Sequence, residues 1–300
     1  MRVLLTGATG FIGRHVVAPL CARGAEVHTI SRDGAAPSGA VGHVGDLMDA
    51  ASVAAVMRAV RPSHLLHLAW CTTPGEYWMT PENLDWVAAS LLLYRHFAEL
   101  GGERVVMAGS CAEYDWSYAL LSETGSPCRP ATLYGAAKDG LRRLLQRAAD
   151  AGGPSFAWGR VFFVYGPGEK PGRLVSDVVA SLLRGEPVET TAGTQVRDFM
   201  HVADVASAFA ALCDATVTGA VNIASGEARP LREIIRQLAD LSGRPDLLHL
   251  GARQMRASEP PRLEANVTRL RQEVGFQPRF DLAAGLADTL GWWRNQTRLG

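Results

Sequence analysis

A glycine-rich turn near the start of the chain constrains the fold more than any other feature. It spans Thr6–Gly13, with the sequence TGATGFIG, and directly follows the apolar segment Val3–Leu5. Its three glycines would permit a tight bend, a close approach of the backbone to a ligand, and close packing of the next helix on the strand. These glycines are Gly7, Gly10 and Gly13. With a helix over residues 12–23 pointing its positive end at an anion, the segment predicts a site for a dinucleotide pyrophosphate; a purely structural turn is the alternative.

Composition excludes several classes of function. The chain has 300 residues, 47% of them hydrophobic, which is enough to bury a large core. Its 30 basic side chains balance 30 acidic ones, so no long-range field draws it to nucleic acid or to an anionic membrane. The longest apolar run, around Val87–Tyr94, is interrupted by Ser90 and is too short to span a bilayer. We therefore expect neither nucleic acid nor a membrane as a partner.

Cysteine usage and the N-terminus indicate the compartment. The five cysteines are scattered, odd in number and without a CxxC pair, which favours reduced thiols over a disulfide framework or a zinc site. They are Cys21, Cys71, Cys111, Cys128 and Cys213. The first apolar strand is too short for the hydrophobic part of a signal peptide. These features predict a cytoplasmic protein with no metal site.

Short β-type runs alternate with amphipathic helical patterns through the first half of the chain. The runs expected to form buried parallel strands are Val3–Leu5, Glu26–Ile30, His64–Ala69, Arg104–Ala108 and Ser155–Phe163. The helical stretches between them include Ala50–Val60, Pro81–Leu100 and Leu133–Ala149. This alternation predicts an α/β fold with a doubly wound parallel sheet, the Rossmann arrangement. The segment Asp33–Gly42, rich in alanine and glycine, is expected to be a surface loop.

The pattern changes after Gly166–Gly168. Prolines and arginines gather between the later helical stretches, most clearly over Arg253–Arg262. We expect a smaller C-terminal α/β lobe that binds substrate over the carboxyl edge of the sheet, where open α/β sheets bind ligands. The predicted dinucleotide-binding domain takes residues 1–165 and about 195–225, and the lobe takes about 166–194 and 226–300.

Two residues near the start of a predicted helix are candidates for proton transfer. Tyr134 and Lys138 are four residues apart, so both side chains lie on one helical face. A phenol has a pKa of about 10 in a model peptide, and proton transfer near neutrality requires a lower value. A neighbouring ammonium would lower it by favouring the phenolate, as would the positive charge of an oxidised nicotinamide. A surface tyrosine beside a solvated lysine is the alternative.

A third candidate, Ser110, follows the strand predicted over Arg104–Ala108. A hydroxyl at this place lies at the carboxyl edge of the sheet, near where the glycine turn would place a nicotinamide. It could donate a hydrogen bond to a substrate oxygen and hold that oxygen beside the tyrosine. Taken alone, a serine that ends a strand is more often a turn or cap residue, so the three features gain weight by occurring in order on one alternating chain.

This ordered set resembles the extended short-chain dehydrogenase/reductase family, which includes nucleotide-sugar epimerases, dehydratases and reductases. The resemblance covers nearly the whole chain and makes Ser110, Tyr134 and Lys138 the catalytic serine, tyrosine and lysine. It implies contacts with the cofactor from the glycine turn, the second strand, the segment Gly45–Leu47, the strand end at His67–Ala69, and the catalytic pair. The residues so assigned are Gly7, Thr9, Gly10, Phe11, Ile12, Gly13, Ser31, Arg32, Asp46, Leu47, Leu68, Ala69, Tyr134 and Lys138.

The resemblance extends to the substrate. Later signatures are matched by Tyr165–Gly168, by Arg197–Val205 and by Asn222–Gly226. Arg197 and Arg256 are by the same resemblance candidates for holding the diphosphate of a nucleotide sugar, a role that suits the guanidinium fork. For each of them, a solvated surface arginine is the alternative.

Departures from the family pattern reduce the number of reactions expected of this chain. Its 4,6-dehydratases carry an acidic residue just after the catalytic serine or threonine, where this chain has Cys111 and Ala112. Alanine cannot move the protons that water elimination needs, so a 4,6-dehydratase is not expected. Cys111 and Ala112 are expected to contact substrate, and Cys111 is either an acid/base for epimerisation or a small core residue. The next residues, Glu113–Trp116, either shape the sugar pocket or form a solvated loop. Phe163 and Trp86 replace asparagines common in relatives.

The end of the second strand bears on the cofactor. Family members that prefer NAD usually have an aspartate or glutamate there, which binds the ribose hydroxyls and repels a 2′-phosphate. This chain has Ser31 followed by Arg32, which can bind a phosphate dianion, with Arg14 as a possible third contact. We therefore favour NADP(H); if Arg32 merely stacks on the adenine, NAD(H) also fits.

Cofactor preference in turn bears on the reaction. The main hypothesis is an oxidoreductase that uses NADPH to reduce a nucleotide-linked 4-keto-6-deoxyhexose, with Tyr134 as the general acid. The alternative is a nucleotide-sugar 4-epimerase with tightly held NAD, and a non-catalytic dinucleotide sensor is a third hypothesis. The resemblance also implies a homodimer formed through the helices around Pro81–Leu100 and Tyr134. The nucleotide, the sugar and the product stereochemistry depend on the shape of the C-terminal lobe.

Overall fold

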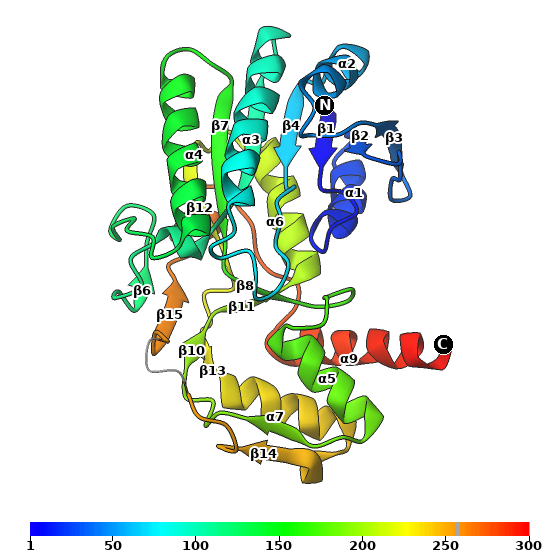
Figure 1. Cartoon of the computed structure of the whole chain (residues 1–300), viewed down its shortest axis with the longest axis vertical. Coiled ribbons are helices and arrows are strands. Elements are labelled where there is room, and N and C mark those ends of the chain that lie inside the picture. Colours follow the sequence, from blue (N-terminus) through cyan, green and yellow to red (C-terminus); the bar gives the residue numbers. More distant parts are fainter. Residues whose placement is uncertain (256–258, 300) are drawn as a thin grey trace.

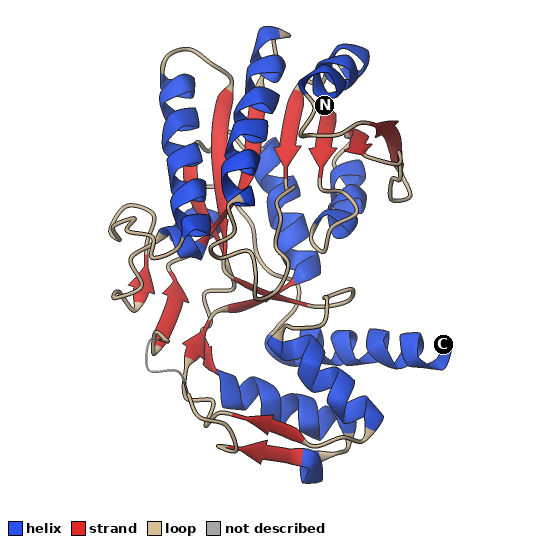
Figure 2. Cartoon of the chain, viewed as in Figure 1, coloured by secondary structure: helices blue, strands red, loops and turns tan. Residues whose placement is uncertain are grey.

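The computed structural model describes residues 1–255 and 259–299. A seven-stranded parallel sheet forms its larger part, with strands in the order β12-β7-β5-β4-β1-β2-β3 (Figures 1 and 2). In chain order these strands are β1 (Arg2–Thr6), β2 (Glu26–Ser31), β3 (Ala40–Val44), β4 (His64–His67), β5 (Arg104–Ser110), β7 (Ser155–Val161) and β12 (Gly219–Ile223). The chain runs outward to β3 on one side of β1 and to β12 on the other, so the strand order reverses between β1 and β4. A doubly wound sheet binds its ligand outside such a switch point.

Helices cover both faces of this sheet (Figure 2). One layer contains α1 (Gly13–Ala22) and α6 (Val202–Asp214), which pack on each other. The other layer contains α2 (Ala50–Val60), α3 (Glu82–Glu99) and α4 (Leu133–Asp150). Each layer encloses its own apolar cluster, one with Val16, Leu20 and Phe209 and the other with Val56, Leu93 and Trp158. The predicted α/β fold with a doubly wound parallel sheet is confirmed.

Smaller sheets and helices form the rest of the molecule. The helices are α5 (Leu174–Arg184), α7 (Leu231–Ser242), α8 (Thr268–Gln272) and α9 (Leu282–Leu299), with the short η1 (Cys111–Glu113) and η2 (Pro245–Leu247). The strands are β6 (Leu120–Leu121), β8 (Phe163–Tyr165), β9 (Val188–Thr190), β10 (Val196–Arg197), β11 (Phe199–His201), β13 (Arg229–Pro230), β14 (Leu248–Leu250) and β15 (Arg262–Ala265). They pair as β13-β10-β15-β6, β11-β8 and β14-β9. A third apolar cluster joins α5, α7 and α9 through Val179, Leu238 and Leu286. Figure 1 shows this smaller unit beyond the carboxyl ends of the large sheet.

Local chemistry explains the elements that carry the site. Gly7 directly follows β1 with φ of +73°, a conformation that residues with a Cβ rarely adopt. α4 begins after Thr132, whose side chain accepts a hydrogen bond of 3.1 Å from the Gly135 amide, as an N-cap does. α2 begins in the same way after Asp49. These caps fix where the helices start relative to the sheet edge.

Three details of the predicted sheet were wrong. The strand predicted over Ser155–Phe163 ends at Val161, and Phe163 begins β8, which pairs with β11 in a separate sheet. The segment Asp33–Gly42 was expected to be a loop throughout, but β3 begins at Ala40 and pairs with β2. β3 is an edge strand whose Val41 and Val44 are 53% and 70% exposed, so it lacks the continuous apolar pattern of a buried strand. The strand predicted over His64–Ala69 ends at His67. The division of the chain into two domains stays a prediction.

No helix in the described part of the chain combines the length and the apolar character needed to cross a membrane.

Candidate active site

A cavity of about 1800 Å³ lies along the carboxyl edge of the large sheet. Its lining runs from the glycine turn and the end of β2, past Ser110 and Tyr134, to Arg197 and Glu189 near the smaller sheets. The cavity is therefore long enough to receive a dinucleotide at one end and a second ligand at the other. Its position agrees with the switch point of the sheet.

The residues predicted to bind the cofactor line one end of this cavity. All of the predicted positions outside the catalytic pair are among its walls: Gly7, Thr9, Gly10, Phe11, Ile12, Gly13, Ser31, Arg32, Asp46, Leu47, Leu68 and Ala69. A Cβ added at Gly7 would lie 2.7 Å from the Ala69 amide nitrogen, so the turn packs directly on the segment that follows β4. No side chain caps α1, which leaves the positive end of that helix facing the cavity. Bare backbone and an uncapped helix end suit a pyrophosphate.

The end of β2 has the polar groups that the sequence suggested, with one exception. Ser31 and Arg32 line the cavity, and Ser31 Oγ donates to the Ala35 carbonyl at 2.9 Å. Arg14 was expected to join them. Its guanidinium instead donates to the carbonyls of Thr9 and Gly10, and Arg14 is not among the lining residues. Arg14 is thus held on the outside of the glycine turn.

Ser110, Tyr134 and Lys138 meet in the middle of the cavity. Ser110 ends β5, and its Oγ accepts from the Ala112 amide at 3.2 Å. Tyr134 lies in the first turn of α4, where its amide donates to the Trp78 carbonyl at 3.0 Å. Lys138 Nζ donates to the Ala108 carbonyl at 2.9 Å. Two helix positions and one strand end are thereby brought together, as the spacing predicted.

The pKa values of Tyr134 and Lys138 differ from those expected from the sequence. Burial raises the pKa of Tyr134, and the Ser110 side chain acts only partly against this. Burial lowers the pKa of Lys138 to about 7, while the Glu113 carboxylate acts in the opposite direction. The lysine therefore loses its own charge near neutrality, and the phenol receives less help from it than the sequence suggested.

Aromatic side chains surround Tyr134. The ring of Tyr77 is 4.9 Å from it, that of Trp78 5.9 Å and that of Trp70 6.4 Å, all edge to face. Lys138 Nζ lies 3.6 Å from the centre of the Trp70 ring, and Trp70 in turn stacks on Trp86. Tyr77 and Trp78 were not predicted as site residues. Their signal was the adjacent aromatic pair in the loop between β4 and α3.

Only some of the residues predicted to contact substrate line the cavity. Cys111 lines the cavity, but burial raises the pKa of its thiol to about 12, which makes it a poor acid/base. Ala112 does not line the cavity and packs beneath Tyr77 and Tyr134 instead. Of the segment Glu113–Trp116, only Trp116 faces the cavity. The other three pack inward or away because η1 turns the chain back under the sheet edge.

Cations line the far end of the cavity. Arg197 is buried and pairs with Glu259 at 3.2 Å. Arg256 lies outside the described residues. Arg253 lines this end too, with its Nε 3.8 Å from Glu189. Lys170 and Arg173 also line the cavity, but Arg173 lies against Tyr77 and donates to the Thr72 carbonyl. None of the three was predicted as a site residue, and their signal was the cationic content of the loops that precede α5 and β15.

Comparisons with known proteins relate this geometry to a family. Residues 3–224 match the model of the NAD dependent epimerase/dehydratase family. A UDP-glucose 4-epimerase of Azospirillum brasilense is 29% identical over 98% of this chain and 92% of that protein. A dTDP-4-dehydro-6-deoxy-D-allose reductase of Streptomyces bikiniensis is 28% identical over 99% of this chain and 97% of that protein.

Solved structures agree in fold along the whole chain. MoeE5 in complex with UDP-glucose and NAD superposes with a TM-score of 0.83 at 32% identity, covering 99% of this chain and 100% of that one. The UDP-glucose 4-epimerase of Thermus thermophilus in complex with NAD gives 0.84 at 27% identity, covering 98% and 99%. The relatives thus include both epimerases and a reductase at similar identity.

Proposed function

Because the chain belongs to the NAD dependent epimerase/dehydratase family, an extended short-chain dehydrogenase/reductase group of enzymes acting on nucleotide sugars, we propose that it is a nucleotide-sugar 4-epimerase that retains its NAD. The observation that carries the proposal is the meeting of Ser110, Tyr134 and Lys138 in one cavity with the glycine turn. Epimerase relatives over almost the full length support it. This reverses the order of preference that the sequence suggested, in which a reductase came first.

The proposed chemistry at the sugar is proton transfer at one oxygen. Tyr134 removes the proton from the hydroxyl on C4 as the carbon loses a hydride, and returns it when the hydride comes back to the other face. Ser110 donates a hydrogen bond to the same oxygen, and Lys138 holds the ribose hydroxyls of the cofactor. Bound NAD supplies the hydride acceptor and, when oxidised, a positive charge that favours the Tyr134 phenolate.

The cationic end of the cavity suits the diphosphate of the substrate. We assign this contact to Arg197 and Arg253, whose guanidinium groups match phosphate oxygens. Arg197 would exchange part of its contact with Glu259 for the phosphate. Arg256, predicted for the same role, remains a prediction.

A reductase is the second candidate, favoured by the end of β2. Ser31 and Arg32 stand where an acidic residue would select NAD, which suits NADPH as a consumed co-substrate. The substrate would then be a nucleotide-linked 4-keto-6-deoxyhexose, and Tyr134 would act as the general acid. A reductase relative of matching length supports this candidate too.

Identifying the nicotinamide that the denatured protein releases distinguishes the epimerase from the reductase. One portion of freshly purified protein is denatured and the released cofactor is identified, while a second portion is assayed as purified for turnover of UDP-glucose without added cofactor. We expect near-stoichiometric NAD and turnover that needs no added cofactor. An empty site that prefers NADPH, with net oxidation of NADPH by a 4-keto-6-deoxy sugar nucleotide, would replace the epimerase by the reductase.

A substitution at the end of β2 tests the cofactor preference on its own. We expect Ser31→Asp to weaken binding of NADPH at least about tenfold relative to NADH, because a carboxylate repels the 2′-phosphate and accepts from the ribose hydroxyls. The Kd values of both cofactors are measured by fluorescence quenching, with Asp33→Asn as the control because Asp33 does not line the cavity. An unchanged ratio would mean that the 2′ position lies elsewhere.

The homodimer expected from the sequence stays a prediction. Leu84 on α3 and Leu144 on α4 are 59% and 56% exposed in the single chain.

A further inference from the structure

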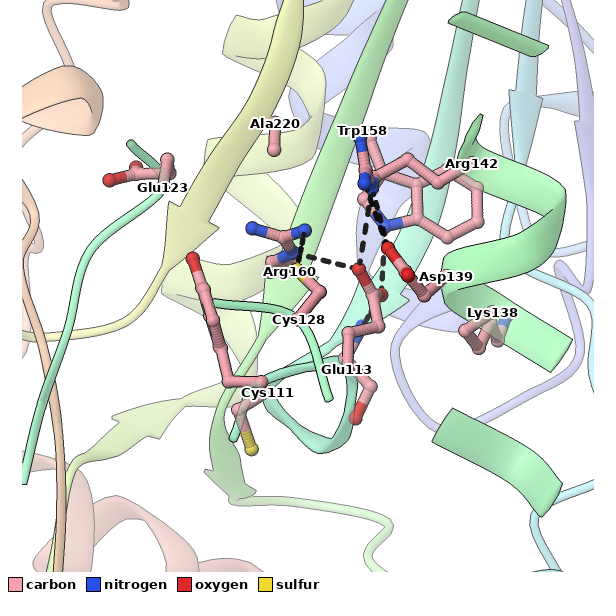
Figure 3. Close-up of polar contacts among 12 residues, drawn as sticks. Cys111, Glu113, Glu123, Cys128, Lys138, Asp139, Arg142, Trp158, Arg160 and Ala220 are labelled. Carbon is pink, nitrogen blue, oxygen red and sulfur yellow. Dashed lines mark hydrogen bonds and ion pairs between the residues drawn. The ribbon is translucent and has the colours of Figure 1, made fainter. Parts of the chain in front are cut away.

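A buried carboxylate lies directly beneath the turn that carries Ser110. Glu113 is completely buried, and Figure 3 shows its contacts with neighbouring strands. Its Oε1 accepts from the Ser110 amide at 2.7 Å and from Trp158 Nε1 at 2.8 Å. Its Oε2 accepts from Arg160 Nε at 2.7 Å and lies 3.9 Å from Arg142 Nε. Its oxygens thus contact donors from β5 and β7 and a further cation from α4.

Arg160 holds this carboxylate from behind. It is 1% exposed, its guanidinium lies 4.3 Å from the centre of the Tyr114 ring, and its Nη2 donates to Cys128 Sγ at 3.0 Å (Figure 3). Removing two charges from water costs about as much as their attraction returns, so such a pair adds little net stability over an apolar one. The arrangement is better explained by what Glu113 orients.

The first group that Glu113 orients is Ser110. With the Ser110 amide held by Glu113 and its Oγ accepting from the Ala112 amide, the hydroxyl proton is left to donate into the cavity. Gly109 is required for this approach, because a Cβ there would overlap Trp158 Nε1 and the Glu113 carboxylate. The turn therefore presents Ser110 as a donor.

The second group is Lys138. Its Nζ lies 5.9 Å from the centre of the Trp158 ring, while the N–H of the same indole points at Glu113. The same indole thus contacts both groups, with its negative face toward the ammonium and its donor toward the carboxylate. In the view of Figure 3, Glu113 and Lys138 both lie below the Trp158 indole, with Lys138 to the right of Glu113.

From these contacts we propose that Glu113 is a positioning residue of the active site, which aims the Ser110 hydroxyl at the substrate oxygen and lends its negative charge to Lys138. The inference rests on the proposed function for the role of Ser110, but its effect on Lys138 stands without any substrate. Glu113 itself does not line the cavity.

Several charged or titratable groups face Lys138. Glu113 from η1 raises its pKa, against a larger lowering by burial. His67 on β4 is buried and has a pKa lowered to about 3, so it is neutral, and Tyr134 on α4 is a neutral phenol near pH 7. Of these groups, only Glu113 carries a charge that favours the ammonium near neutrality. Neutralising Glu113 must therefore lower the pKa of Lys138 further.

The chain allows a direct measurement of this effect because it contains only two lysines, Lys138 and Lys170. Protein labelled with carbon-13 at the lysine ε position is titrated by NMR, and Lys170→Arg leaves one signal for assignment. We expect Glu113→Gln to move the Lys138 titration to lower pH by about one unit. Asp204→Asn is the matched control, since Asp204 on α6 is also a buried acid but accepts from the amides of Arg279 and Phe280 and not from Ser110. A Lys138 titration that does not move in Glu113→Gln, or moves equally in the control, overturns the proposal.

Kinetics of a paired variant separate positioning from folding. Glu113→Leu with Arg160→Met replaces the ion pair by apolar side chains. Because such a replacement of a buried ion pair is often neutral for stability, we expect the double variant to fold. We expect kcat to fall at least about tenfold with little change in KM, and the basic limb of the pH profile to move to lower pH. Wild-type kcat and pH profile in a folded double variant would overturn the role of Glu113. If the wild type turns over neither UDP-glucose nor a 4-keto-6-deoxy sugar nucleotide, the proposed function fails, and the lysine titration still decides the inference.

Discussion

Tyr134→Phe is expected to reduce kcat about a thousandfold, with KM for the nucleotide sugar changed by less than about threefold. The substitution removes one oxygen from a ring that is 8% exposed, so it leaves the aromatic packing with Tyr77, Trp78 and Trp70 in place. What it removes is the group that exchanges a proton with the sugar oxygen, a contribution of about a hundred- to ten-thousandfold in enzymes. Steady-state kinetics at saturating cofactor measure the effect.

Tyr77 offers a matched control for this experiment. It is 6% exposed, lines the same cavity and lies 4.9 Å from the Tyr134 ring, but it is on the loop after β4 and not on α4. We expect Tyr77→Phe to lower kcat less than about tenfold. Equal losses in the two variants, or turnover of Tyr134→Phe within a few-fold of wild type, would contradict the assignment of the proton to Tyr134.

The parts of the site predicted from sequence depend on short-range geometry. The glycine turn, the pair Tyr134 and Lys138, and Ser110 at a strand end each follow from a few neighbouring residues and the period of a helix or strand. Their meeting follows from the parallel sheet, which brings successive strand ends to one edge. The fold and these three positions were therefore accessible before the structure.

Other features depend on which way a loop turns. Ala112 was expected at the substrate, but η1 directs it beneath Tyr134 and sends Glu113 inward to Arg160. Glu113 and Arg160 are 47 residues apart, and no local pattern relates a glutamate after one strand to an arginine within another. The pairing of Arg197 with Glu259 spans 62 residues and was inaccessible for the same reason.

The pKa shift of Tyr134 could not be predicted from the sequence either. Spacing correctly placed Lys138 beside Tyr134, but it could not show that both side chains are buried. Burial disfavours the charged form of each, raising the pKa of the phenol and lowering that of the ammonium. The predicted lowering of the phenol pKa by Lys138 stays a prediction, and desolvation, which only packing determines, dominates here.

Asp198→Ala is expected to have the largest effect on stability, lowering the free energy of unfolding by about 4 kcal/mol. Asp198 is completely buried between β10 and β11. Its Oδ1 accepts from the amide and the hydroxyl of Ser225 at 2.8 and 2.7 Å, and its Oδ2 accepts from the amides of Gly226 and Ala265 at 2.9 and 3.4 Å. Ser225 and Gly226 follow β12 of the large sheet, whereas Ala265 ends β15 of a small one. Alanine leaves the buried amide of Ala265 and the half-buried amides of Ser225 and Gly226 without this acceptor.

Two further variants test how the loss of stability depends on the number of hydrogen bonds removed. Asp198→Asn retains one acceptor oxygen and should cost about half as much, and Ser225→Ala removes one hydrogen bond and should cost about 1 kcal/mol. Urea unfolding followed by circular dichroism measures all three. A loss below about 1 kcal/mol in Asp198→Ala would mean that water replaces the carboxylate at these amides. Because Asp198 adjoins Arg197, loosening this junction should also weaken binding of the nucleotide sugar, so that one buried carboxylate links the joining of the two sheets to the cationic end of the cavity.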